Sequence, residues 1–231
     1  MTKRSFSPII IIQILFSLFS QVGLGASFTF IIPSEPPDTT ITANSMHLQG
    51  GVIVLEGNVR GVRVSDILTC QKAFINKNKG WILASNTPRL FRKESDPEKQ
   101  IIRESTLDAL NIYWNNNDKR ISASPAVTLK IEERSWDLAT YSWVIISSDS
   151  MDGFQDSSEL RFSGRVRIKD KDHFGQGESL DYYKASSTVI LEGNAQVEME
   201  EWSQKENKMI KKVITGQRIN YNLDSKESSS E

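Results

Sequence analysis

The stretch VIVLEGNVRGV, residues 52–62, alternates apolar and polar residues around a central glycine. Two later stretches repeat this arrangement: ELRFSGRVRIKD at 159–170 and VILEGNAQVEME at 189–200. Alternation with a period of two is typical of a strand that has one buried face and one solvated face. The three stretches therefore predict long antiparallel β-strands, and an all-β fold.

A glycine interrupts the apolar face of each stretch at the same point: Gly57, Gly164 and Gly193. Glycine weakens a strand interior, so its presence there usually marks a bulge or a sharp bend. We expect each strand to curve at its glycine. A sheet of such strands would wrap around a cavity or around a second sheet.

The order of the elements indicates an internal repeat. A polar strand containing Ser-Met, a turn and then a glycine-centred strand occur at 41–59 and again at 145–166. Repeats of this size favour a stacked architecture built from similar units. Helical periodicity is scarce, and the best helical candidate is Pro97–Trp114, although its second half is rich in β-forming residues.

Composition excludes several classes of protein. The net charge of −1 over 231 residues argues against nucleic-acid binding through phosphate contacts. Cys70 is the only cysteine, so neither an internal disulfide nor a cysteine-based zinc site can form. We expect Cys70 to be a buried, inert thiol.

The N-terminus has the layout of an export signal. Lys3 and Arg4 precede the apolar stretch 8–19, and small residues follow at 23–26. The uncharged stretch is also long enough for a membrane anchor, so cleavage and retention both remain open. We expect residues 1–26 to be a signal peptide or retained anchor, 27–40 a linker, 41–223 the folded domain and 224–231 a disordered tail.

Catalytic and metal-binding signatures are weak. His47 and His173 are accompanied by no serine or cysteine motif, and GESLD at 177–181 does not match a nucleophile elbow. The stretch 170–178 lacks ligands that a calcium loop requires, and it is better interpreted as a hairpin turn. We therefore predict no enzyme activity, no cofactor and no metal site.

Five segments carry a resemblance to a known family: ITANSM (41–46), VIVLEGNVRGVRV (52–64), LTCQKAFIN (68–76), GQGESLDYYKASSTVILEGNAQVE (175–198) and ITGQRINYNL (214–223). Together they resemble the LptA/OstA-like family of periplasmic lipopolysaccharide-transport proteins. The resemblance covers roughly 41–88 and 151–223. The stretch 89–150 is similar to the family only in being strand-like, and its role and the member of the pathway stay open.

The resemblance implies a fold, a ligand and partners. The fold would be an antiparallel, incompletely closed β-jellyroll, with an apolar interior that holds the acyl chains of lipopolysaccharide. Partners would be lipopolysaccharide, other transport proteins bound through edge strands, and further copies stacked head to tail in the periplasm, with no nucleic acid. The residues expected to line the interior are Leu55, Val59, Phe162, Val166, Leu191 and Val197.

Two other functions compete with lipid transport. A structural β-protein of the cell envelope would have a filled core and no ligand. A secreted glycan hydrolase would need a pair of carboxylates about 5 to 10 Å apart in a cleft. An open roll with an apolar interior would favour the transport function over both.

Overall fold

The computed structural model describes residues 28–32, 39–154, 159–203, 208–223, 225 and 227–230. All the regular secondary structure in these residues is β-strand, and all the strands belong to one antiparallel sheet. The expected all-β, antiparallel fold is confirmed. The expected signal peptide or anchor at 1–26 lies outside the described residues.

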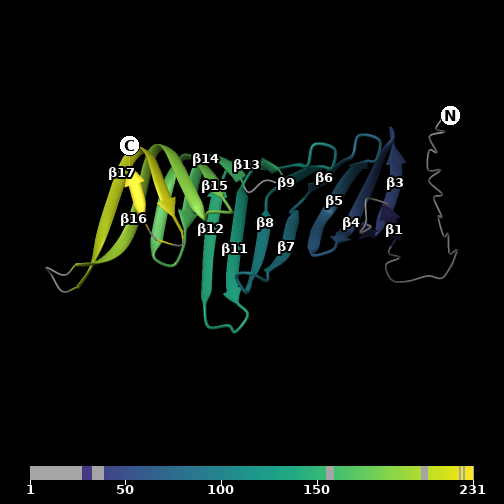
Figure 1. Cartoon of the computed structure of the whole chain (residues 1–231). Coiled ribbons are helices and arrows are strands. Elements are labelled where there is room, and N and C mark those ends of the chain that lie inside the picture. The colour runs from purple at the N-terminus through teal and green to yellow at the C-terminus, as the bar shows by residue number, and fades with distance from the viewer. Residues whose placement is uncertain are drawn as a thin grey trace, which may run out of the picture.

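The strands run in chain order along an elongated body, from β1 at one end to β18 at the other (Figure 1). Their bounds are β1 (Phe28–Ile32), β2 (Thr39–Ala43), β3 (Ser45–Gln49), β4 (Val52–Arg63), β5 (Asp66–Asn76), β6 (Trp81–Ser85), β7 (Arg89–Asp96), β8 (Ile101–Asp108), β9 (Asn111–Asn115), β10 (Arg120–Ser124), β11 (Val127–Ser135), β12 (Tyr141–Ser148), β13 (Ser150–Phe154), β14 (Glu159–Lys169), β15 (His173–Tyr183), β16 (Thr188–Ser203), β17 (Lys208–Asn222) and β18 (Ser228–Ser230).

The pairings divide the sheet into two layers. Layer A contains β1, β2, β7, β8, β11 and β12, and layer B contains β3, β6, β9, β10, β13 and β18. The long strands run through both. For example, β4 pairs with β2 over its second half and with β3 over its first half. The sheet is thus folded over on itself, and its apolar inner faces meet between the layers.

We call the line along which the sheet folds over the fold line. It passes through the three glycines that were predicted to bend their strands. Gly57, Gly164 and Gly193 have φ angles of +76°, +78° and +76°, and the strand register shifts beside each of them. The prediction of a bend at each glycine is confirmed. Their expected place on the apolar face is wrong, because an added Cβ would meet the polar side chain of Asn44, Asp149 or Glu178 instead of the core.

The predicted repeat is visible in two matching corners. Asn44 separates β2 from β3, and its N–H donates to the Gly57 carbonyl at 2.8 Å. Asp149 separates β12 from β13 in the same way, and its N–H donates to the Gly164 carbonyl at 2.9 Å. Each corner therefore joins two short strands to one long bent strand.

The helical candidate at Pro97–Trp114 is wrong, because this segment contains β8 and most of β9. β8 pairs with β7 and β11, and β9 pairs with β6 and β10. Leu107 and Ile112 are buried by these neighbours, so long-range pairing overrides the helix-forming residues at the start of the segment.

The termini of the described chain also join the sheet. β1 lies within the expected linker at 27–40 and pairs with β2, while residues 33–38 lie outside the described part. β18 lies within the expected disordered tail and pairs with Ile219–Tyr221 of β17.

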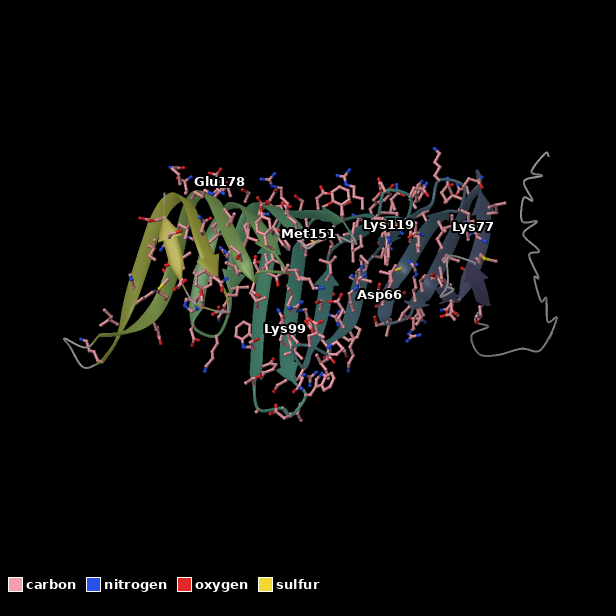
Figure 2. The ribbon with its side chains drawn as sticks, in the orientation of Figure 1. Asp66, Lys77, Lys99, Lys119, Met151 and Glu178 are labelled. Atoms are coloured by element: carbon pink, nitrogen blue, oxygen red, sulfur yellow. The ribbon has the colours of Figure 1, made fainter. Side chains whose placement is uncertain are left out.

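Opposite the fold line, each layer ends in a row of hairpin turns. Lys77 and Lys119 lie along one long side of the molecule, and Lys99 lies along the other (Figure 2). Among the described strands, no pairing joins the turns of layer A to those of layer B. The sheet is therefore closed along the fold line and unevenly closed along this second side, which we call the mouth.

Candidate functional site

All six residues predicted to line the interior lie between the layers. Each is at most 3% exposed, and they come in pairs from three long strands. These pairs are Leu55 and Val59 on β4, Phe162 and Val166 on β14, and Leu191 and Val197 on β16. The alternating pattern of the sequence thus identified the inner faces of these strands.

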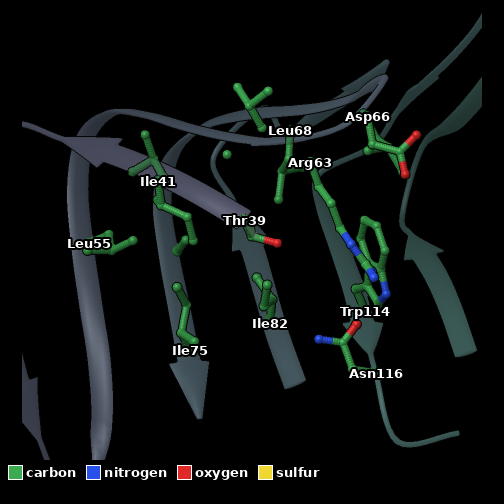
Figure 3. Close-up of a pocket in the computed structure, with 15 residues that line it drawn as sticks. Thr39, Ile41, Leu55, Arg63, Asp66, Leu68, Ile75, Ile82, Trp114 and Asn116 are labelled. Atoms are coloured by element: carbon green, nitrogen blue, oxygen red, sulfur yellow. The ribbon is translucent and has the colours of Figure 1, made fainter. Parts of the chain in front are cut away.

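A hollow between the layers lies near the N-terminal end of the sheet. It contains about 570 Å³ of non-atom space, counted out to open solvent, and Leu55 and Val59 line it. Ile41, Leu55 and Ile75 lie at one side of this first hollow, whereas Arg63, Trp114 and Asn116 gather at the other (Figure 3). The hollow is therefore apolar at one end and polar at the other.

A second hollow lies in the middle of the sheet and contains about 840 Å³ of non-atom space, again counted out to solvent. Its walls come from β7, β8 and β11 of layer A and from β9, β10 and β13–β15 on the facing side. Leu90 and Trp114 line both hollows. We call the two adjoining hollows the groove. Phe162, Val166, Leu191 and Val197 lie in the packed core and not among the residues that line the groove.

The inner face of layer A changes from apolar to charged toward the mouth. Along β7 the inward side chains are Leu90, then Arg92, then Glu94, and only Leu90 is fully buried. Strand register places Arg92 beside Asp66 of β5, and Arg103 of β8 between Glu94 and Glu133. Opposite charges therefore alternate across the rim of the groove.

Ion pairs hold these rim side chains. The Arg92 guanidinium donates two hydrogen bonds of 2.7 Å to the Asp66 carboxylate. Arg103 pairs with Glu133 within layer A. Side chains in these pairs are 13% to 27% exposed, so the pairs are less screened than surface ion pairs.

An ion pair crosses the mouth. Lys184, in the turn between β15 and β16, pairs with Glu94 of β7, and the two residues are 90 positions apart in the chain. Lys184 also lines the second hollow. This contact ties the turns of layer B to the rim of layer A directly over the groove.

Trp114 provides a buried polar atom at the polar end of the first hollow (Figure 3). Its indole Nε1 is buried and has no hydrogen-bond partner among the described residues. Buried N–H groups are normally paired, so this donor is available to a polar atom inside the groove. The sequence patterns assigned Trp114 no role. They also missed Arg92, Arg103 and Lys184, whose meeting depends on strand pairing.

A buried polar cluster closes the C-terminal part of the mouth. Asp170 Oδ1 accepts the backbone N–H groups of Asp172 and His173 at 2.8 Å and lies 2.9 Å from His173 Nδ1. The Tyr221 hydroxyl lies 3.5 Å from Asp170 Oδ2. Burial, together with the neighbouring Asp170 carboxylate, raises the pKa of the Tyr221 phenol. These bonds form the hairpin turn that the sequence predicted.

The described residues contain few side-chain groups that would indicate catalysis or metal binding. No group of three or more His, Cys, Asp or Glu side chains there could hold a metal ion. Cys70 is 5% exposed, and burial raises the pKa of its thiol to about 11, so the expected buried thiol is confirmed. In the same part of the chain no helix has the length and hydrophobicity to cross a membrane.

Comparison with known families decides the identity of the fold. The family of the LptA/(LptD N-terminal domain) LPS transport protein matches residues 40–227. The chain belongs to this family. Its members are non-catalytic transport proteins, so the prediction of no enzyme activity is confirmed and the glycan hydrolase is excluded. Family membership implies periplasmic lipopolysaccharide transport.

The solved structures that are similar to this chain include LptH, the LptA homologous periplasmic component of the conserved lipopolysaccharide transport device from Pseudomonas aeruginosa. The two chains are 14% identical, and the match covers 67% of this chain and 82% of LptH with a TM-score of 0.36. No curated protein matches this chain.

Proposed function

We propose that this protein binds lipopolysaccharide in the groove and carries it across the periplasm. The observation that supports this most directly is the groove itself. It lies in a member of a lipopolysaccharide-transport family, it is apolar at its base, and its rim is charged. Acyl chains would lie against the apolar base while the polar part of the lipid stays at the mouth.

Burial of acyl chains is sufficient to retain a lipid. Each CH₂ group removed from water contributes about 0.8 kcal/mol, so parts of several chains give strong binding without specific contacts. Leu55 and Val59 would contact the chains in the first hollow. We propose the same contact with the acyl chains for four further residues, Phe162, Val166, Leu191 and Val197. This contact requires the lipid to reach the packed core on either side of β14–β16.

Edge strands offer a route for transfer between proteins. Among the described strands, β3 pairs only with β4, and all five of its residues are exposed, including Met46 and Leu48. At the other end, β16 is the only described strand that pairs with the first half of β17, and Val213 in this half is exposed. An unpaired edge is a template for another strand, so we propose that copies or partner transport proteins join there head to tail.

Photo-crosslinking tests lipid binding in the groove. A photo-reactive residue replaces Ile82, which is only partly buried and lines the first hollow, and a second variant carries it at the exposed Leu110. We expect the Ile82 variant to crosslink to lipopolysaccharide and the Leu110 variant to stay unlinked. Equal labelling at both sites, or none at Ile82, would favour a structural envelope protein with no ligand.

A further inference from the structure

The second hollow differs from the first in the charge of its walls. Arg63 and Asp66, a cation and a carboxylate, both line the first hollow. The charged residues that line the second are Arg92, Arg103 and Lys184, and its described lining includes no carboxylate. The carboxylates Asp66, Glu133 and Glu94 hold these cations from outside the lining.

The three cations reach the hollow from three elements. Arg92 comes from β7, Arg103 from the adjacent β8, and Lys184 from the turn after β15 on the facing side of the mouth. Below them the walls are apolar, with Leu107, Leu129, Ile131, Met151 and Leu160. A ligand that satisfies both regions has an anionic group next to hydrocarbon chains.

We propose that Arg92, Arg103 and Lys184 form a seat for a phosphate group of an acylated lipid whose chains occupy the second hollow. The proposal rests on the function proposed above and specifies which part of the lipid the mouth recognises. A phosphate group has several acceptor oxygens and can carry two negative charges, so it can accept from all three cations at once. A single carboxylate has only two oxygens to offer.

Lys184 has a second role in this arrangement. Its ion pair with Glu94 lies across the mouth, so a lipid that enters from the side must separate the two residues. The phosphate then replaces Glu94 as the acceptor for the Lys184 ammonium. Exchange of one acceptor for another allows the mouth to open without leaving the Lys184 charge unpaired, which would be costly at a partly buried site.

Two probes with the same chains separate the phosphate from the hydrocarbon. The probes are phosphatidic acid and diacylglycerol, each with one fluorescent chain, and the dissociation constant is measured with the full chain in one detergent. We expect Lys184→Gln and Arg103→Gln to weaken binding of phosphatidic acid about tenfold, as for loss of a hydrogen bond between charged groups. Binding of diacylglycerol should not weaken, and Lys184→Arg should retain the affinity for phosphatidic acid.

Lys93→Gln is the matched control. Lys93 precedes Glu94 on β7 but points to the outer face, where it pairs with Glu104 at 3.1 Å. It should leave binding of both probes unchanged. Thermal unfolding checks that each variant is folded. If Arg103→Gln unfolds, Lys184→Gln, at a turn residue that is one-third exposed, provides the decisive measurement.

Each remaining outcome has a definite meaning. Equal loss of both probes in Lys184→Gln, or the same loss in Lys93→Gln, would overturn the phosphate seat. Displacement of phosphatidic acid by an equal concentration of inorganic phosphate would assign the three cations to free phosphate and also overturn the proposal. If the wild-type chain binds neither probe and does not crosslink at Ile82, the proposed transport function itself fails.

Discussion

Asp149 and Gly164 meet at a corner where the sheet folds over. The Asp149 N–H donates to the Gly164 carbonyl at 2.9 Å, and a Cβ on Gly164 would lie 2.5 Å from Asp149 Oδ2 and 2.9 Å from its Cβ. Asn44 and Gly57 repeat this relationship near the N-terminal end. Because Gly164 has no side chain, the long strand β14 can approach the break between β12 and β13 closely. This close approach sets the bend.

Replacement of Gly164 by alanine should destabilise the fold strongly. The residue has φ +78°, which costs about 1–2 kcal/mol for an L-residue, and the contact with Asp149 adds about 1–3 kcal/mol. Gly50→Ala is the control, since Gly50 also has positive φ but no atom lies within 4 Å of its added Cβ. Denaturant titration should show the larger loss for Gly164→Ala, and equal losses would contradict a role for close approach.

The packed core and the wall of the groove should respond differently to truncation. Leu191 is 1% exposed, so Leu191→Ala should cost about 2–5 kcal/mol in the free energy of unfolding. Ile82 is partly buried beside the first hollow, so Ile82→Ala should cost less and should weaken lipid binding. Denaturant titration measures the stability effect, and the dissociation constant of the fluorescent lipid probes measures the effect on binding. A stability loss at Ile82 as large as that at Leu191 would mean that the hollow is not a binding surface.

Tyr221 should make stability depend on alkaline pH. Burial raises the pKa of its phenol above the ordinary value of about 10 in the folded state, whereas the unfolded chain keeps that ordinary value. The unfolded state therefore loses its proton first, and the stabilisation is full below about pH 10 and declines as the pH rises further.

Tyr221→Phe should remove this contribution. The free energy of unfolding, measured by denaturant titration at pH 9 and pH 11, should fall less steeply in Tyr221→Phe than in the wild type. Tyr183→Phe, at a partly exposed position two strands away, serves as the comparison. Parallel curves for the wild type and Tyr221→Phe would show that the phenol ionises equally in both states.

A charge on the β3 edge should reduce self-association. Leu48 is 73% exposed on a strand with one unpaired edge, and charged side chains there oppose strand addition. Leu48→Asp should shift sedimentation profiles toward the monomer. Leu110→Asp, at a residue that is 50% exposed but belongs to no strand, should not. If both substitutions act alike, the association does not use the β3 edge.

Local patterns in the sequence predicted much of the fold. The alternation around Leu55, Phe162 and Leu191 identified the inner faces correctly, because side-chain direction in a strand depends only on position along it. The glycines marked the bends, but their outward direction was missed, since the register shift beside each glycine interrupts the alternation. The helix predicted at Pro97–Trp114 was wrong, because strand pairing with distant segments overrides the helix-forming residues of this segment.

Pairing partners explain why identical local motifs differ in burial. Met46 and Met151 hold the same place in the two repeats, yet Met46 is 43% exposed and Met151 is 3% exposed. Among the described strands, β3 has a single neighbour at the end of the sheet, whereas β13 lies between β10 and β14. Burial at these positions depends on the third strand, which the local sequence does not specify.

The sequence by itself determined an all-β chain of bent strands with one apolar face, because alternation and backbone freedom are local properties of the residues. Only the tertiary structure decided where the two layers pack and where they leave a groove. It also placed Lys184 across the mouth from Glu94, although 90 positions separate them. The cations of the rim lie on different strands, and their meeting depends on register between segments far apart in the chain.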